Sequence, residues 1–125
     1  MSDKTQYYTT TGKGFLVKAR HYLAEGDLLQ ASEKGWGAAA QMVKSVAEAR
    51  GWPHDAHHHL WGTINRLAKE TGDTDIRALF TLASALHTNF YEGWMPVEHV
   101  ADNLGHVENL LLKLETFNQT SGFHE

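Results

Sequence analysis

Apolar residues recur three and four positions apart along most of the chain, which is the spacing of one face of an α-helix. Glycines and prolines interrupt this pattern and divide it into five segments. The predicted helices cover residues 15–25, about 28–50, about 53–68, about 75–92 and 97–114. No segment alternates apolar and polar residues as a half-buried strand does. The pattern predicts an all-α fold, an antiparallel bundle of about five helices joined by short connections.

The two ends of the chain are more polar than its middle. Residues 1–14, MSDKTQYYTTTGKG, are predicted to be a polar N-terminal lead-in, and residues 120–125 a C-terminal tail. Residues 15–119 then form a single helical-bundle domain. The most regular apolar line lies in the last predicted helix, at Val97, Val100, Leu104, Val107, Leu111 and Leu114.

Two features predict close contacts between helices or between subunits. The segment KGWGAAA is rich in small residues, so another helix can approach closely around Gly35, Gly37 and Ala38. That helix could belong to the same bundle or to a second subunit. A second apolar line in the last helix, with Leu110 and Phe117, is the other candidate dimer surface.

Composition and charge narrow the classes of function. The chain has 125 residues, 42% of them hydrophobic, and a formal net charge of −4. An acidic balance disfavours a protein that mainly clamps duplex nucleic acid, which needs a basic face. The absence of cysteine excludes disulfides and cysteine-ligated zinc. No apolar run is long enough to span a membrane, and the polar N-terminus lacks the apolar core of a signal peptide, so we expect a cytoplasmic protein without a membrane partner.

The segment SALHTNFYEGWMP, residues 84–96, holds the first candidate site. His87 falls on the same side of its predicted helix as Ile76, Phe80 and Ala83, and Tyr91 lies one turn further on, so both are expected to face inward or into a groove. His87 could be a core histidine bonded to a neighbour or a titratable group in a groove. The other polar or aromatic residues of the segment, taken as candidates for binding, are Asn89, Glu92 and Trp94.

Glu33 is the second unusual residue, because it shares the predicted helix face of Leu29, Trp36 and Ala40. A carboxylate on an apolar face is costly unless it is paired. A structural ion pair and a catalytic role are both open, and we predict that Glu33 bonds to a ring nitrogen of His87. Its neighbours Lys34 and Trp36 are candidates for binding, although solvated faces also explain basic residues spread over three helices.

The segment HDAHHHLW holds the third candidate. His54 and His58 are four residues apart, a spacing that can place two imidazoles of one helix on one metal ion. A zinc site usually needs three or four protein ligands, and only these two are clearly positioned by the spacing. The alternative is a first helical turn that is merely rich in histidine. No cofactor is predicted.

Two longer segments, ASEKGWGAAAQMVKSVAEARGWPHDAHHHLW and LFTLASALHTNFYEGWMP, resemble the archaeal paralogous-repeat family called PaREP, over residues 24–114. That family is usually grouped with the HEPN superfamily of helical nucleotide-binding domains. The resemblance implies a HEPN-like bundle that is commonly dimeric. HEPN proteins include RNases, partners of nucleotidyltransferases and nucleotide-binding modules.

The sequence departs from the RNase members in one motif. Those members carry an arginine separated from a histidine by four to six residues, whereas Arg77 and His87 are separated by nine. We therefore expect a homodimer that binds a nucleotide, a nucleic acid or a protein partner. The alternative is an RNase-like enzyme that cleaves phosphodiesters with His87, Glu33 and Tyr91, with or without a metal at His54 and His58.

Overall fold

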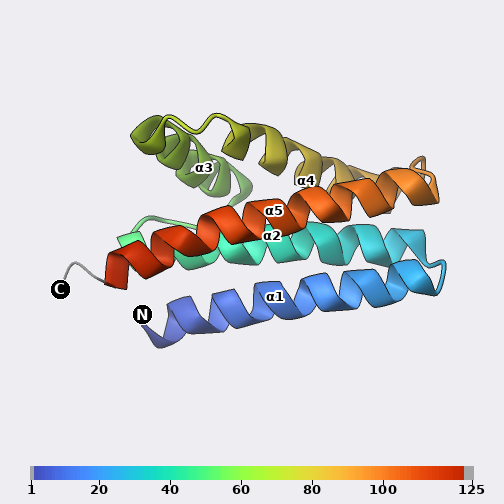
Figure 1. Cartoon of the computed structure of the whole chain (residues 1–125), viewed down its shortest axis with the longest axis horizontal. Helices are drawn as coiled ribbons and strands as arrows, with labels where there is room; N and C mark the ends of the chain where they lie inside the picture. The colour runs from blue at the N-terminus through green and yellow to red at the C-terminus, as the bar shows by residue number, and fades with distance from the viewer. Residues whose placement is uncertain (1, 123–125) are drawn as a thin grey trace.

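The chain folds into an all-α bundle of five helices, as the apolar spacing predicted. The computed structural model describes residues 2–122, with side chains as far as Asn118, and no strand occurs within that part. The helices are α1 (Asp3–Ala24), α2 (Leu28–Arg50), α3 (His57–Thr71), α4 (Asp75–Glu92) and α5 (Val97–Gly122). Figure 1 shows α1, α2 and α5 running side by side along the long axis, with the shorter α3 and α4 on the side of α2 away from α1.

The bundle has two ends of different kinds. The α1–α2 and α4–α5 connections lie at one end, and the start of α1 and the end of α5 lie at the other (Figure 1). Three- and four-residue connections at the first end make the joined helices antiparallel. None of the described helices has the length and apolar character needed to cross a membrane.

Helix α1 begins at Asp3, so the prediction of a polar lead-in over residues 1–14 was wrong. Ser2 caps the helix by accepting a hydrogen bond from the Thr5 backbone N–H at 3.1 Å. The buried face of this half-helix consists of Thr5, Thr9 and Gly12, which are too small and too polar to produce an apolar period. The buried Thr9 hydroxyl is satisfied by hydrogen bonds to the Thr5 carbonyl and to the Ser45 hydroxyl of α2.

Helix α5 is also longer than predicted, since it continues to Gly122 and takes in the start of the proposed 120–125 tail. Residues 123–125 lie outside the described part of the chain. The added turns stay attached to the bundle: Asn118 is buried and donates a hydrogen bond to Ser45 at 2.6 Å.

Helix α2 is the central helix, because its small residues let other helices of the same chain approach closely. These residues are therefore covered within the chain and cannot form a dimer surface. A Cβ atom on Gly35 would lie 2.5 Å from Leu104 and 2.9 Å from Leu86, and one on Gly37 would lie 2.9 Å from Phe15. The candidate Leu110 is likewise fully buried. Both proposed dimer surfaces are therefore largely consumed inside the chain, where they allow α1, α4 and α5 to pack closely on α2.

Candidate functional site

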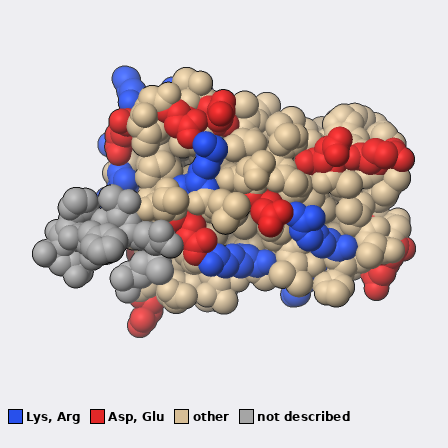
Figure 2. Space-filling view, in the orientation of Figure 1, with Lys and Arg blue, Asp and Glu red and all other residues tan. Residues whose placement is uncertain are grey.

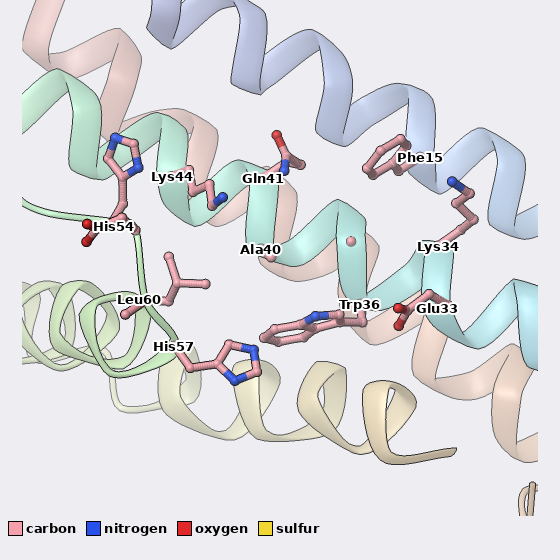
Figure 3. Close-up of a pocket in the computed structure, with 13 residues that line it drawn as sticks. Phe15, Glu33, Lys34, Trp36, Ala40, Gln41, Lys44, His54, His57 and Leu60 are labelled. Atoms are coloured by element: carbon pink, nitrogen blue, oxygen red, sulfur yellow. The ribbon is translucent and has the colours of Figure 1, made fainter. Parts of the chain in front are cut away.

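A groove of about 410 Å³ opens beside α2, between α1 and the segment that leads into α3. Figure 3 shows its lining side chains: Phe15 from α1, a row from Glu33 to Lys44 along α2, and His54, His57 and Leu60 from the other side. A volume of this size is that of a site for a small ligand.

The predicted contact between Glu33 and His87 is confirmed. His87 Nδ1 lies 3.0 Å from Glu33 Oε1, and both side chains are partly buried. The His87 ring also packs on Trp36, with ring centroids 5.2 Å apart, and Trp36 contacts His57 edge-on at 5.1 Å. The rings form one cluster, in which the imidazoles of His57 (α3) and His87 (α4) contact the indole of Trp36 (α2). Glu33, Trp36 and His57 also line the groove, so this cluster forms one of its walls.

Two lysines of α2 line the same groove. Lys34, a predicted binding residue, lies over the Phe15 ring with its Nζ 4.5 Å from the ring centroid. Lys44 follows ten residues later, and Figure 3 places the two toward opposite ends of the groove. Both are half-buried, and within the described residues neither forms an ion pair. Sequence reasoning missed Lys44, because its place in the groove depends on where the connection after α2 returns.

The groove also receives the N-terminus of α3. The N-cap residue of this helix, Ala56, has no side chain able to cap it, and both Ala56 and His57 line the groove. The first backbone N–H groups of a helix have no acceptor within the helix, and they favour an anion by their partial positive charge. Sequence reasoning started α3 near Pro53 and therefore missed the uncapped end.

The acidic neighbours of this end are engaged with histidines. Asp55 Oδ1 lies 2.7 Å from His59 Nδ1, and His54 Nε2 lies 2.9 Å from Glu48 Oε1. A backbone N–H bond and the contact with His59 hold the pKa of the Asp55 carboxyl below its usual value.

The two-histidine metal site predicted from spacing does not form. His54 precedes α3, which begins at His57, so the spacing of four to His58 is not a helical one. His54 bonds to Glu48 and packs against Tyr8, whereas His58 lines a separate cavity. Within the described residues, no group of three or more histidines and carboxylates lies close enough together to hold a metal ion.

Asn89 has a structural role and lies outside the groove. It is fully buried, donates to Ser32 Oγ at 2.9 Å and accepts from the backbone N–H groups of Trp94 and Met95, both at 2.8 Å. These bonds fix the α4–α5 connection against α2. The amide therefore serves the fold, and it also lines a cavity between the two connections at this end of the bundle.

The remaining candidates lie outside the groove. Tyr91 contacts the His87 ring edge-on at 5.4 Å but is 73% exposed, so the prediction that it faces inward was wrong. Glu92 and Trp94 are also exposed and follow it at the end of the bundle. The structure thus brings together Glu33, Lys34, Trp36 and, behind them, His87, and separates them from the rest of the segment 84–96.

Comparisons with known proteins place the chain in a family. None of the curated proteins matches it. A crystal structure of a protein from Sulfolobus solfataricus is similar, with a TM-score of 0.75 and 19% sequence identity over 86% of this chain and 95% of that one, which shows a shared fold. The model of the archaeal PaREP1/PaREP8 family matches residues 8–111, a range that includes every residue lining the groove. The chain therefore belongs to the archaeal PaREP1/PaREP8 family, as the resemblance of its two long segments indicated.

Proposed function

We propose that this protein is a binding module whose groove takes an anionic ligand of the nucleotide or nucleic-acid class. The observation that carries the proposal is the pair Lys34 and Lys44, two half-buried cations on one groove with no ion-pair partner in the described part of the chain. The two carboxylates that also line the groove, Glu33 and Asp55, contact His87 and His59, so the lysine charges favour an anionic ligand.

The spacing of the cations favours a ligand with more than one anionic group. Ten residues of helix separate the two lysines by about 15 Å along the axis. The uncapped start of α3 adds a further anion-binding element on the groove. A nucleoside triphosphate or a short single strand of nucleic acid has charges that can reach several of these positions.

The other wall supplies aromatic surface of the kind that bases stack on. His57 is exposed on the groove, with Trp36 packed beside it and only 7% exposed, and the partly buried Phe15 closes the opposite side beneath Lys34. Stacking on aromatic side chains contributes about 1–3 kcal/mol per base in single-strand binding proteins. A mixed groove of cations and rings thus fits a nucleotide better than it fits a purely inorganic anion.

Calorimetric titration with ATP and with a six-nucleotide single-stranded RNA tests the proposal. We expect Lys34→Gln/Lys44→Gln to weaken binding by about tenfold or more, since each lost charge contact contributes on the order of 1 kcal/mol. The control, Lys69→Gln/Arg77→Gln, removes the same charge from exposed positions outside the groove and should change the affinity less than twofold. No binding by the unmodified protein, or equal losses in both variants, would reject the groove as the site.

A second candidate function, metal-independent phosphodiester cleavage, is favoured by one observation: the His87 ring, oriented by Glu33, lies 5.5 Å from the His57 ring. One imidazole could take the proton of an attacking 2′-hydroxyl while the other protonates the leaving 5′-oxygen, which leaves a 2′,3′-cyclic phosphate. The same RNA incubated with a chelator should then be cleaved, and His57→Gln or His87→Gln should abolish cleavage. Intact RNA after incubation with the unmodified protein would leave binding as the function.

Three further properties are part of the proposal: a HEPN-like superfamily relationship, a homodimer and a cytoplasmic location. The five-helix bundle is compatible with the first. A groove of about 500 Å³ between α4 and α5, lined by Leu79, Leu82 and Leu112, supports the second, because Leu112 is 60% exposed. The absence of a membrane-spanning helix among the described residues is compatible with the third.

A further inference from the structure

A cluster of exposed apolar side chains marks the end of the bundle that holds the α1–α2 and α4–α5 connections. Seven large hydrophobic side chains are exposed in the described part of the chain, and four of them belong to this end. They are Leu29 (43% exposed), Tyr91 (73%), Trp94 (51%) and Val97 (44%). We call these four residues the turn-end surface. Its apolar area needs an explanation, because large exposed patches on small domains commonly mark interaction sites.

The turn-end surface is held in place by the fold. The four residues come from the start of α2, the end of α4, the α4–α5 connection and the start of α5. Leu29 packs beside Gly93, with its Cδ2 3.7 Å from the place of a Cβ atom there. Trp94 contacts His99 edge-on at 4.9 Å. Asn89 fixes the backbone of Trp94 from below, so the indole projects from a rigid connection.

A cavity lies next to these residues. It has a volume of about 370 Å³ and is lined by Asp27, Leu28, Leu29, Gly93 and Met95, among others. It separates the α1–α2 connection from the α4–α5 connection. An apolar side chain of a partner could enter it between the two turns, with the Asp27 carboxylate at its edge.

The charge of this end is entirely acidic. The two connections at this end and the residues beside them, 25–29 and 91–98, contain four carboxylates and no lysine or arginine: Glu25, Asp27, Glu92 and Glu98. In Figure 2, acidic side chains lie at the end away from the grey residues, and others lie at the opposite end beside lysines and arginines. Glu92 and Glu98 flank Trp94 and Val97, and both are exposed without an ion pair among the described residues.

We infer that the turn-end surface docks a basic polypeptide segment, one that carries lysines or arginines around an apolar anchor. The anchor would bury Trp94 and Leu29, and the basic groups would meet Glu92, Glu98 and Asp27. Cations also interact favourably with the exposed faces of tryptophan and tyrosine. This partner is distinct from the anionic ligand of the groove, which lies on another part of α2.

Charge disfavours the other occupants. In a symmetric pair of copies the same patch faces itself, so Glu92 and Glu98 would meet carboxylates of equal charge. A nucleic acid or an anionic lipid surface would be repelled in the same way. A cationic partner, by contrast, would form favourable electrostatic contacts with the carboxylates of Glu92 and Glu98.

Fluorescence anisotropy with a labelled 14-residue peptide tests this inference. The probe is built of lysine and alanine with two leucines one helical turn apart, and a comparison peptide has serine in place of the leucines. We expect the leucine peptide to bind at least about tenfold more tightly than the serine peptide, since an apolar anchor in a pocket supplies much of an interface energy. Binding should weaken as salt is raised.

The variants separate this surface from general attraction to an acidic protein. Trp94→Ala and Glu92→Gln/Glu98→Gln should each weaken the leucine peptide by about tenfold, a loss typical of an interface hot spot. The matched controls Tyr7→Ala, an aromatic exposed elsewhere, and Asp3→Asn/Glu70→Gln should change its affinity less than twofold. Equal affinity for the two peptides, or equal losses in test and control variants, would overturn the inference. Sedimentation showing a dimer that Trp94→Ala dissociates would also overturn it, by assigning the surface to a second copy.

Discussion

At the scale of single residues, Asn89 holds two helices and a connection together through one amide. Replacing it with alanine leaves the backbone N–H groups of Trp94 and Met95 without an acceptor, whereas the Ser32 hydroxyl keeps its bond to the Leu28 carbonyl. Because each unsatisfied buried group costs about 1–3 kcal/mol, we expect Asn89→Ala to lower the free energy of unfolding by about 2–4 kcal/mol. Urea denaturation measures this, with the exposed Asn109→Ala as the control. A loss below about 0.5 kcal/mol would contradict the structural role.

The ion pair between Asp73 and Lys113 ties the α3–α4 connection to α5 at 2.7 Å. The Lys113 ammonium lowers the pKa of the Asp73 carboxyl, and that carboxylate raises the pKa of Lys113. Stability from the lowered carboxyl is present above its ordinary value near 3.8 and is lost as pH falls through the lowered pKa. Stability from the raised ammonium is present below about 10.5 and is lost as pH rises through the raised pKa.

Asp73→Asn should therefore lower the melting temperature at pH 7, and the difference from the unmodified protein should vanish near pH 2. Calorimetric scans across pH measure this effect, which should be modest because both side chains are partly exposed. In the variant Lys113→Met, the further change Asp73→Asn should have little effect. If Asp73→Asn lowered the melting temperature equally in the presence and absence of Lys113, the ion pair would not be the cause of the loss.

The residue scale also shows why one contact was predictable and another was not. Glu33 and His87 each interrupt an apolar face, and two such interruptions on facing helices satisfy each other. Asn89 gives no such signal, because its partners are backbone groups of a connection whose path depends on the whole fold. Lys44 is similar, since it faces a groove that exists only where the chain returns.

At the scale of helices, close packing on α2 depends on the missing side chain of Gly35. An added Cβ would lie 2.5 Å from Leu104 and 2.9 Å from Leu86, both fully buried leucines with little room to move. We expect Gly35→Ala to destabilise the protein by about 1–3 kcal/mol through overpacking. Gly62→Ala on α3, where no atom lies within 4 Å, should instead stabilise it by about 0.5–1 kcal/mol through helix propensity. Thermal denaturation of both variants tests these two expectations. A melting temperature that rises in both variants, or falls in both, would contradict this packing.

The helices themselves were predictable from apolar spacing wherever large side chains form the buried face, as on α2, α4 and α5. The first half of α1 was not, because its buried face is made of threonines and a glycine. The start of α3 was misplaced for another reason. Pro53 suits a first helical turn, but the chain stays irregular until His57. His54 therefore lies outside the helix, and the helical spacing of His54 and His58 that the metal prediction assumed is absent.

At the scale of the whole molecule, the chain separates two kinds of surface. The groove beside α2 carries lysines without an ion pair and an uncapped helix start, whereas the charged residues that flank the turn-end surface, Glu92 and Glu98, are carboxylates. A net charge of −4 conceals this division, and only the fold shows which charges share a surface.

The α4–α5 groove leads to a prediction about the assembly. We expect sedimentation equilibrium at micromolar concentration to give about twice the chain mass of 14.0 kDa. Leu112→Glu should shift the mass to that of one chain without lowering the melting temperature of the monomer, because the side chain is 60% exposed. A single-chain mass for the unmodified protein would contradict the homodimer.

The most direct test of the proposed anionic ligand is a ¹H–¹⁵N correlation spectrum recorded during titration with ATP. The structure predicts that the largest shifts fall on the backbone N–H groups of His57 and His58 at the start of α3 and on residues around Lys34 and Lys44. These shifts should saturate with one common dissociation constant and be lost in Lys34→Gln/Lys44→Gln. Shifts that are absent at millimolar ATP, or that concentrate away from the groove, would contradict the central claim.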